Sequence, residues 1–370
     1  MIYLDYSATT PILEEVLDTY VKVSKNYIGN SNSLHKLGVE SKKLEESATK
    51  QIADLLQVKP SEIIYTSGAS ESNNTAIKGI AFSYQNRGKH ILTTPFEHSS
   101  IVEPLNYLKM LGFEIEYIAL KEDGTIDLDA FQKQIRKDTI LVTLASVSSE
   151  LGILQPIDEI GKVLKNYPKC FFHVDLTQSI GKVDVPLKYV DLASLSSHKF
   201  YGPKGIGVLI KKEGIELLPL IQGGKSTTKY RSGTPALPLI VSMAKALRLI
   251  FEKDQSKVSK LNSYLREELK KIDGVSINSP DTSIPHILNI SVKGIKPETL
   301  LHALEEHEIY ISTQSACATG KESLPVYTIT KDSSKASSSL RISLSYLTTK
   351  EECESFIQVL KEEIQKLRIR

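Results

Sequence analysis

The sequence predicts an α/β protein: a large domain with a mixed, mostly parallel, doubly wound sheet, and a smaller α+β domain. The chain has 370 residues, too many for one small core. From about residue 60 to 210, short apolar runs typical of buried strands alternate with helical patterns. Repeated alternation of this kind builds parallel sheets covered by helices. After Pro238 the alternation stops, which indicates a second unit.

The strands and helices predicted for the large domain follow one another along the chain. The predicted strands cover residues 63–65, 90–92, 115–118, 140–142, 171–174, 192–195 and 205–210. The predicted helices cover residues 72–85, 101–111 and 157–166, the last preceded by Pro156, a residue favoured near helix starts. Ligands bind at the carboxyl ends of such strands, so the residues that follow them are the candidates for a site.

The smaller domain is predicted from the remaining patterns. A long helical segment runs from Pro238 to about Lys271, and strands at 287–292 and 340–344 alternate with helices at 297–307 and 350–367. The serine-rich run 331–339 is predicted to be a mobile loop. We therefore expect a large domain at residues 14–254, and a small domain made of residues 1–13 and 255–370.

Composition and charge exclude several classes of protein. Hydrophobic residues make up 41% of the chain and the net charge is +2, which leaves no electrostatic footprint for nucleic acid. No apolar run approaches the roughly 20 residues that span a bilayer, and the N-terminus lacks a signal-peptide layout. We expect a cytoplasmic protein without membrane contact. The three cysteines lack CxxC spacing, which supports neither disulfides nor a metal site.

Lys199 is the first candidate site residue, because it follows an apolar strand-like run, with Asp175 and Gln178 shortly upstream. A Schiff-base lysine needs a held amine, and a nearby carboxylate must keep the pyridine nitrogen of pyridoxal phosphate protonated. Asp175 and Lys199 can supply that pair. Taken alone, the run Ser-Ser-His-Lys fits a surface lysine beside a buried strand about as well.

Further residues at the predicted strand ends suit the same cofactor. The run Ser67-Gly68-Ala69-Ser70-Glu71 lies between a strand and a helix, where backbone N–H groups can hold a phosphate; a simple glycine turn capped by Ser70 is the alternative. Ser196 and His198 are suitable further donors. His98 could stack on a pyridine ring, and Gln178 could bond its phenolic oxygen.

With these motifs in order, the chain resembles the cysteine desulfurase family of class V aminotransferase-like enzymes, from Tyr3 to about Thr349. The motifs are YLDYSATTP at 3–11, TSGASESN at 66–73, EH at 97–98, HVDLTQS at 173–179, HKFYGPKG at 198–205 and RSGT at 231–234. The resemblance implies a fold type I enzyme that uses pyridoxal 5'-phosphate. It also implies conversion of L-cysteine to L-alanine, with the sulfur passing to an acceptor protein.

The resemblance also implies roles for particular residues. Lys199 would form the Schiff base, Asp175 would pair with the pyridinium and His98 would stack over the ring. The other implied cofactor ligands are Ala69, Ser70, Gln178, Ser196, His198 and Thr234. Members of the family are homodimers in which the residue matching Thr234 reaches the phosphate bound by the other subunit.

Three residues are implied to act on the substrate. Cys317, in Ser-Ala-Cys-Ala-Thr, matches the cysteine that takes up the sulfur as a persulfide, and a mobile loop would suit that task. Arg341 matches the arginine that holds the substrate carboxylate, although a strand arginine facing solvent fits its pattern as well. Asn30 matches a position near the substrate. Cys170 and Cys353 fit small apolar or surface residues.

The chain departs from the family at Ser148-Ser149, where two asparagines are usual and one bonds the cofactor ring oxygen. We expect a retained cofactor with altered turnover. The shorter tail leaves the acceptor open between an iron–sulfur scaffold and a tRNA-thiolation or other sulfurtransferase protein. Selenocysteine lysis, transamination, and a regulatory protein without efficient catalysis are the competing functions.

Overall fold

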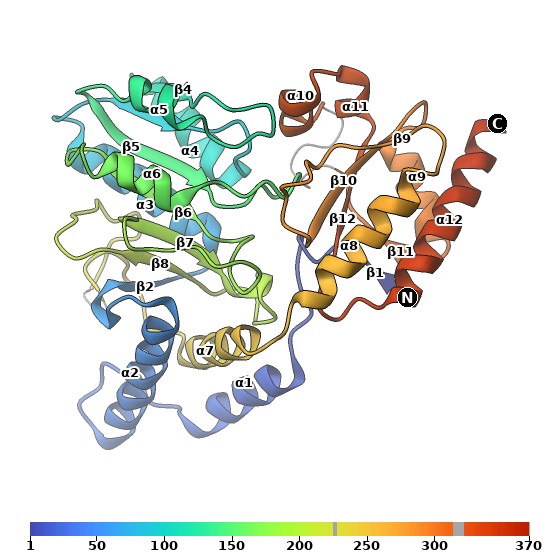
Figure 1. Cartoon of the computed structure of the whole chain (residues 1–370). Helices are drawn as coiled ribbons and strands as arrows, with labels where there is room; N and C mark the ends of the chain where they lie inside the picture. Colours follow the sequence, from blue (N-terminus) through green and yellow to red (C-terminus); the bar gives the residue numbers. More distant parts are fainter. Residues whose placement is uncertain (225–227, 314–321, 370) are drawn as a thin grey trace.

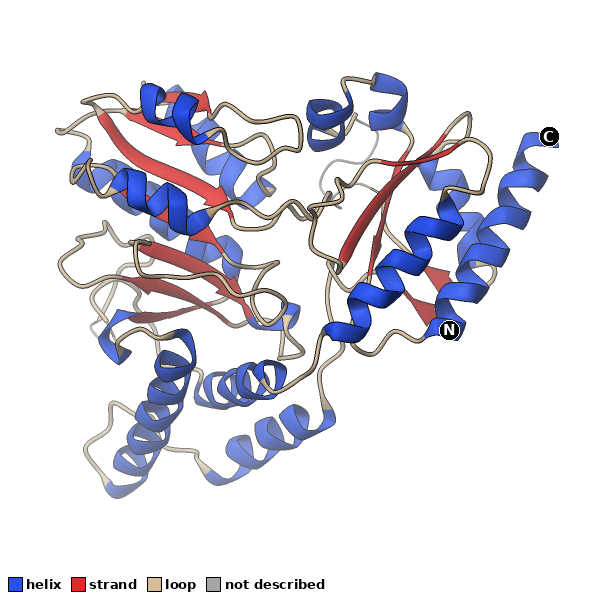
Figure 2. Ribbon diagram, viewed as in Figure 1, coloured by secondary structure: helices blue, strands red, loops and turns tan. Residues whose placement is uncertain are grey.

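The computed structural model describes residues 1–224, 228–313 and 322–369. The chain forms two lobes (Figure 1), one built around a seven-stranded sheet and one around a smaller sheet (Figure 2). The N-terminal segment belongs to the smaller lobe, where β1 (Ile2–Tyr3) pairs in parallel with β11 (Ile309–Tyr310).

The large sheet has the mixed, mostly parallel topology that the sequence predicts. Its strand order is β2-β8-β7-β6-β5-β3-β4. Only β8 runs against its neighbours β2 and β7, and the remaining pairs are parallel. The strands are β2 (Ile63–Thr66), β3 (His90–Thr93), β4 (Glu114–Tyr117), β5 (Thr139–Ala145), β6 (Phe171–Asp175), β7 (Leu192–Ser196) and β8 (Gly207–Lys211).

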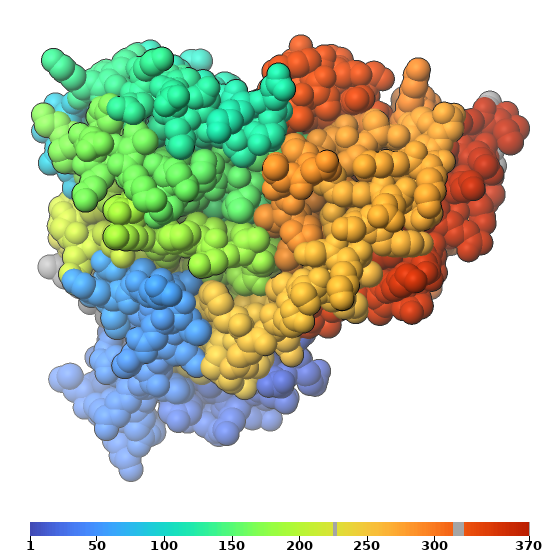
Figure 3. Space-filling view, in the orientation of Figure 1, coloured from blue at the N-terminus to red at the C-terminus, as the bar shows by residue number. Residues whose placement is uncertain are grey.

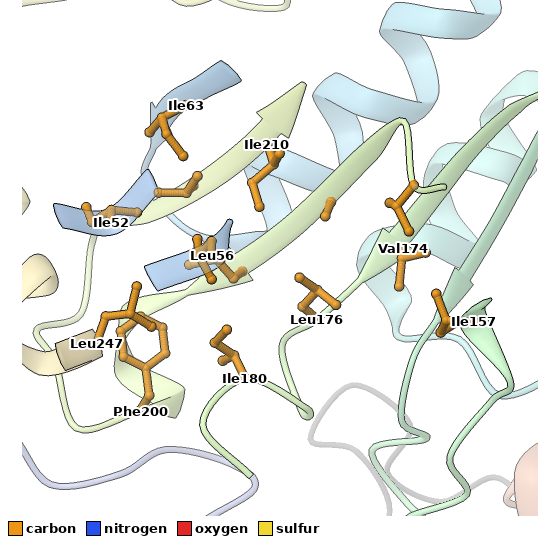
Figure 4. Packing of buried hydrophobic residues seen from close by; sticks show 14 of the residues in the cluster. Ile52, Leu56, Ile63, Ile157, Val174, Leu176, Ile180, Phe200, Ile210 and Leu247 are labelled. Atoms are coloured by element: carbon orange, nitrogen blue, oxygen red, sulfur yellow. The ribbon is translucent and has the colours of Figure 1, made fainter. Parts of the chain in front are cut away.

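Helices cover both faces of this sheet. On one face of the sheet, α3 and α4 contribute side chains to a buried hydrophobic cluster. On the other face, α2, α5, α6 and α7 contribute to the largest buried cluster. Figure 4 shows part of that largest cluster, with Phe200 and Leu247 beside Leu56. The helices are α1 (Glu14–Asn26), α2 (Lys36–Leu56), α3 (Ala69–Tyr84), α4 (Ser99–Met110), α5 (Leu128–Gln134), α6 (Ile157–Leu164) and α7 (Leu237–Phe251).

The smaller lobe has its own buried core, to which Leu4 from the N-terminal segment belongs. An antiparallel sheet of order β12-β10-β9 packs against helices. Its elements are α8 (Ser256–Leu269), β9 (Val275–Ile277), β10 (Ile287–Val292), α9 (Pro297–Glu305), α10 (Leu324–Thr330), α11 (Ser333–Ser337), β12 (Ser339–Ser343) and α12 (Lys350–Ile369). The separate cores accord with a two-lobed chain, and the boundaries at residues 13 and 254 stay a prediction.

Two elements predicted after Pro238 were wrong, and the first part of that stretch, α7, packs on the large sheet and not in the smaller lobe. The expected single helix from Pro238 to Lys271 is two helices, because Asp254 accepts hydrogen bonds from the backbone N–H and the hydroxyl of Ser256 and starts α8 anew. The serine-rich run expected to be a loop contains α11, whose first N–H groups are capped by Asp332. Serine-rich composition therefore did not prevent a short capped helix.

Candidate active site

A cavity of about 460 Å³ lies at the carboxyl ends of the parallel strands. The loops that follow β2, β3, β5, β6 and β7 all reach it, as expected for a ligand site in an open α/β sheet. Its lining includes Ala69, Ser70, His98, Asp175, Gln178, Ser196, His198 and Lys199. Eight of the predicted site residues are therefore brought together by the fold.

Lys199 stands just after β7, in the connection to the antiparallel strand β8, as predicted. Its Nζ donates to the backbone carbonyls of Ser7, at 2.6 Å, and Ala8, at 2.8 Å. Burial lowers the pKa of this amine to about 8; the charge of Arg341 acts in the same direction, and the carboxylate of Asp175 opposes it. The neutral amine is therefore far more populated near neutral pH than in a solvent-exposed lysine.

Asp175 ends β6 and is 5% exposed. Its Oδ1 accepts a hydrogen bond from the Thr177 N–H, and its Oδ2 accepts one from Asn73 Nδ2, each at 2.8 Å. These two bonds fix the plane of the carboxylate at the wall of the cavity. A protonated ring nitrogen in the cavity would find a pre-oriented acceptor.

The start of α3 forms the end of the cavity suited to a phosphate. No side chain caps this helix at Gly68, so the first N–H groups of α3 stay available beside Ser70. Gly68 has a φ of +152°, and a Cβ there would meet Ser196 Oγ at 3.4 Å. His198 approaches from the same side, and burial together with the charges of Lys199 and Lys204 lowers its pKa to about 4.

Gln178 is buried, and the bonds around it determine the direction of its amide. The Ser7 carbonyl can only accept, and it takes a hydrogen bond from Gln178 Nε2 at 2.9 Å, so Gln178 Oε1 is the atom that faces Lys182 Nζ, 2.9 Å away. Burial lowers the pKa of Lys182 to about 7, with the charges of Lys199 and Arg341 adding to the effect. The amide nitrogen is thereby held away from Lys182, on the side of the N-terminal segment.

His98 is the N-cap of α4 and is exposed to the cavity. Its Nδ1 lies 2.9 Å from Ser100 Oγ and accepts the Ser100 backbone N–H at 3.1 Å. Burial lowers its pKa, the charge of Asp175 opposes that, and the charges of Lys199 and Arg341 add to it. The ring is thus held by one edge, and its other edge faces the cavity.

Arg341 on β12 is 4% exposed, so the solvent-facing alternative for this residue is wrong. Its Nη2 pairs with Asp5 Oδ1 at 2.9 Å, and its Nη1 donates to the Ser149 carbonyl at 3.1 Å. Ser149 itself lines the cavity, whereas Arg341 lies behind it. The role predicted for Arg341 in binding the substrate carboxylate stays a prediction.

Besides Arg341, two described residues predicted for the site, Thr234 and Asn30, are not among those that line the cavity. Thr234 is exposed in a small neighbouring pocket that shares Ser67 and Gly205 with the cavity, and Asn30 is exposed in the α1–α2 loop, where its Oδ1 accepts the Asn32 N–H. Cys317 lies outside the described residues. The roles predicted for all three stay predictions.

The two cysteines given structural roles are both buried. Cys170 is 7% exposed and Cys353 is fully buried in the core of the smaller lobe. Burial raises the pKa of the Cys170 thiol, and burial raises that of Cys353 to about 12. Neither thiol has the thiolate character that a nucleophile needs.

Ser148 and Ser149 differ in environment. Ser148 is 2% exposed, and its Oγ accepts the Leu151 N–H in a turn. Ser149 faces the cavity and offers its carbonyl to Arg341. The position that matters for a bound ligand is therefore Ser149.

A possible metal group among the described residues lies away from the cavity, at the sheet edge, and comprises His90, Glu114 and Glu116. Both ring nitrogens of His90 already have partners, Thr139 Oγ1 and Glu116 Oε2, and Arg136 pairs with Glu114 at 2.7 Å. These bonds account for the cluster without an ion.

Sequence reasoning missed the residues that orient the site. Asn73, Ser100 and Lys182 each bond a predicted residue, and Asp5 pairs with Arg341. Asn73 and Asp5 lie inside motifs already singled out, whereas Ser100 and Lys182 do not. Asn73 and Asp175 are 102 positions apart, and Asp5 and Arg341 are 336 apart, so only the fold could identify these two pairs.

The donor set fits pyridoxal phosphate: a low-pKa amine, a fixed carboxylate, a flat ring at the cavity and an uncapped helix start stand around one space. Lys199, Asp175 and the start of α3 would hold the cofactor. Fold and site together define a pyridoxal-phosphate enzyme of the α/β class.

The chain belongs to the class-V aminotransferase family, whose model matches residues 2–356. It is 38% identical over 376 residues to the cysteine desulfurase IscS of Dictyoglomus turgidum, covering 99% of this chain and 95% of that protein. A solved NifS-like protein superimposes with a TM-score of 0.92 at 34% identity, covering 99% of both chains. A structure described as SspA in complex with cysteine superimposes with a TM-score of 0.83 at 32% identity, covering 93% of this chain and 99% of that chain.

Proposed function

We propose that this chain is a pyridoxal-phosphate-dependent L-cysteine desulfurase, which converts L-cysteine to L-alanine and leaves the sulfur as a persulfide on Cys317. The observation that carries the proposal is the low-pKa amine of Lys199, held opposite the fixed carboxylate of Asp175 in one cavity. The IscS relative and the cysteine complex of SspA support the choice of substrate.

Pyridoxal phosphate, when bound, supplies an electron sink for bonds broken at the substrate's Cα. Asp175 is positioned to hold a proton on the ring nitrogen. The N–H groups at the start of α3 are positioned to bind the phosphate. Burial lowers the pKa of the Lys199 amine to about 8, which brings it close enough to neutral pH for Nζ to accept and return a proton. Arg341 provides the positive charge that orients the substrate carboxylate.

The sulfur step is a transfer between two thiols. The Cys317 thiolate attacks the substrate sulfur, an S–S bond forms, and the carbon–sulfur bond of the substrate breaks. The electron pair of the broken bond stays with the substrate carbon, which takes up a proton and becomes the methyl group of alanine. No external oxidant is needed, and a reductant or acceptor then removes the terminal sulfur.

The experiment measures alanine and sulfide from L-cysteine with a thiol reductant. Cys317→Ala is expected to abolish both products while retaining the cofactor absorbance band, and Lys199→Ala to lose the products and shift that band. Cys170→Ala is the matched control, because its thiol is buried in the largest core cluster and does not line the cavity. Full alanine production by Cys317→Ala would overturn the nucleophile, and transamination of keto acids would replace the function.

We infer a homodimer as the working form. The α1–α2 loop projects from the body of the chain (Figure 3), and it exposes Ile28 by 78% and Leu34 by 97%. Exposed apolar side chains on a projecting loop favour burial by a second copy. Thr234 next to the cavity suits a contact made across such an interface. Light scattering should give a molar mass twice that of one chain, and the Leu34→Glu variant should give the mass of a single chain.

The persulfide is proposed to pass to an acceptor protein, an iron–sulfur scaffold or a tRNA-thiolation or other sulfurtransferase protein. Incubation with ³⁵S-cysteine and candidate acceptors, followed by mapping of the labelled thiol, tests the acceptor and Cys317 together. We also propose a cytoplasmic location, which fractionation of the source cells tests. As a separate finding, none of the helices in the described parts of the chain combines the length and the apolar character of a membrane span.

A further inference from the structure

The hydrogen bonds around His98 define which ring nitrogen carries the proton. The backbone N–H of Ser100 can only donate, and it points at His98 Nδ1 from 3.1 Å. A nitrogen that accepts this bond has no hydrogen of its own. Nδ1 is therefore the unprotonated nitrogen of a neutral ring.

The Ser100 hydroxyl adds a second donor to the same nitrogen. Ser100 is buried, and Asn73 Nδ2 donates to its Oγ from 2.9 Å. The hydroxyl hydrogen is then free to point at His98 Nδ1, which lies 2.9 Å away. Two independent donors thus converge on Nδ1.

The direction of the Asn73 amide is set by Asp175. Asn73 is fully buried, and its Nδ2 also donates to Asp175 Oδ2 at 2.8 Å. A flipped amide would turn its oxygen toward this carboxylate, an unfavourable contact of two acceptors. The carboxylate therefore orients Asn73, Asn73 orients Ser100, and Ser100 faces His98 as a donor.

We propose that Ser100, oriented by Asn73, is a positioning residue that holds His98 as the neutral tautomer with its proton on Nε2. The inference rests on the proposed function for the ligand that His98 faces. Within the described residues, Nε2 makes no hydrogen bond, and the ring lines the cavity. His98 thus presents an N–H donor to an oxygen or carboxylate of the bound ligand, and its Nε2 cannot take up a proton in this state.

The charges that face His98 agree with a neutral ring. Burial lowers its pKa, and the cationic groups of Lys199 and Arg341 lower it further, against the opposite effect of Asp175. Protonation of Nδ1 would also place two hydrogens between Nδ1 and the Ser100 N–H. The donor arrangement and the charges therefore favour the same protonation state.

The test is ¹⁵N NMR of the cofactor-loaded protein labelled at its eight histidines, with His98→Gln used to assign the signals. The expected spectrum near pH 7 gives His98 Nδ1 the chemical shift of an unprotonated nitrogen and Nε2 that of a protonated one. Ser100→Ala removes one donor, and should raise the measured pKa of His98 by roughly 0.5 to 1. Ser100→Thr restores the hydroxyl and should restore the pKa.

Ser99→Ala is the matched control, since it removes the neighbouring hydroxyl, which makes no bond to His98, and should leave the pKa of His98 unchanged. A wild-type spectrum with the proton on Nδ1, or an unchanged pKa in Ser100→Ala, overturns the inference. Alanine production is measured in parallel. Loss of the proton assignment with activity retained overturns only this inference, whereas loss of activity with the assignment intact overturns only the proposed function.

Discussion

Removing one partner of the ion pair between Arg341 and Asp5 should destabilise the protein far more than breaking one of its surface pairs. The two side chains are 5% and 17% exposed, and the Nη2–Oδ1 distance is 2.9 Å. Removing one partner of a buried pair leaves the other charge uncompensated, which costs about 3–5 kcal/mol. Asp5 keeps some access to water, so we expect Asp5→Asn to lower the free energy of unfolding by about 3 kcal/mol.

The exposed pair Lys50–Asp54 is the matched control, with its 2.7 Å Nζ–Oδ2 distance and side chains 69% and 62% exposed. Asp54→Asn should cost at most about 0.5 kcal/mol, because water already solvates both charges. Urea unfolding followed by circular dichroism suits this protein, which has no tryptophan. Equal losses in Asp5→Asn and Asp54→Asn would refute the reasoning from burial.

A double-mutant cycle separates the pair from its surroundings. Arg341→Met should cost a similar amount to Asp5→Asn, and the double variant clearly less than the sum, with a coupling of about 2 kcal/mol. In activity assays, Asp5→Asn should raise KM for cysteine more than it lowers kcat, since Arg341 loses a fixed position. An additive cycle would mean that the two charges do not support each other.

Three further predictions concern neighbouring groups. Lys182→Met removes the donor to Gln178 Oε1 and should weaken cofactor binding roughly 5-fold in an absorbance titration, about 1 kcal/mol; unchanged affinity would contradict it. Burial lowers the pKa of His286 from 6.5 to about 3, so its stabilising effect is present above pH 6.5 and is lost as the pH falls. In urea unfolding, the free energy of unfolding of the wild type should fall by roughly 2 kcal/mol between pH 6.5 and 5, relative to that of His286→Gln. Ser149→Asn, at the cavity wall, should shift the pH titration of the cofactor absorbance band, and an unshifted titration would show that this position does not reach the ring.

The sequence predicted the elements whose signals are local. The strands and the lysine between β7 and β8 follow from apolar runs, and the cavity residues follow from their places after those runs. The helix break at Asp254 and the cap at Asp332 depend on single side-chain bonds inside polar runs, which a periodicity count does not detect.

The site was predictable as a set of groups, but not as a network. His98 and Asp175 were identified, whereas their link through Asn73 joins residues 102 positions apart. Arg341 was identified, but its burial against Asp5 comes from the pairing of β12 with the N-terminal segment, at Asp5 and Ser343. Contacts of this kind depend on tertiary packing and leave no periodic trace in the chain.

The Lys199 amine is held by hydrogen bonds to two backbone carbonyls, those of Ser7 and Ala8, and this has a consequence for mutagenesis. Backbone atoms are common to all amino acids, so a substitution at either position leaves its carbonyl in place. Saturation mutagenesis of Ser7 and Ala8 would therefore not detect these two hydrogen bonds. Only changes in chain length between β1 and α1 would displace the carbonyls. One-residue deletions and insertions at positions 7–10 would therefore reveal a dependence that no table of single substitutions records.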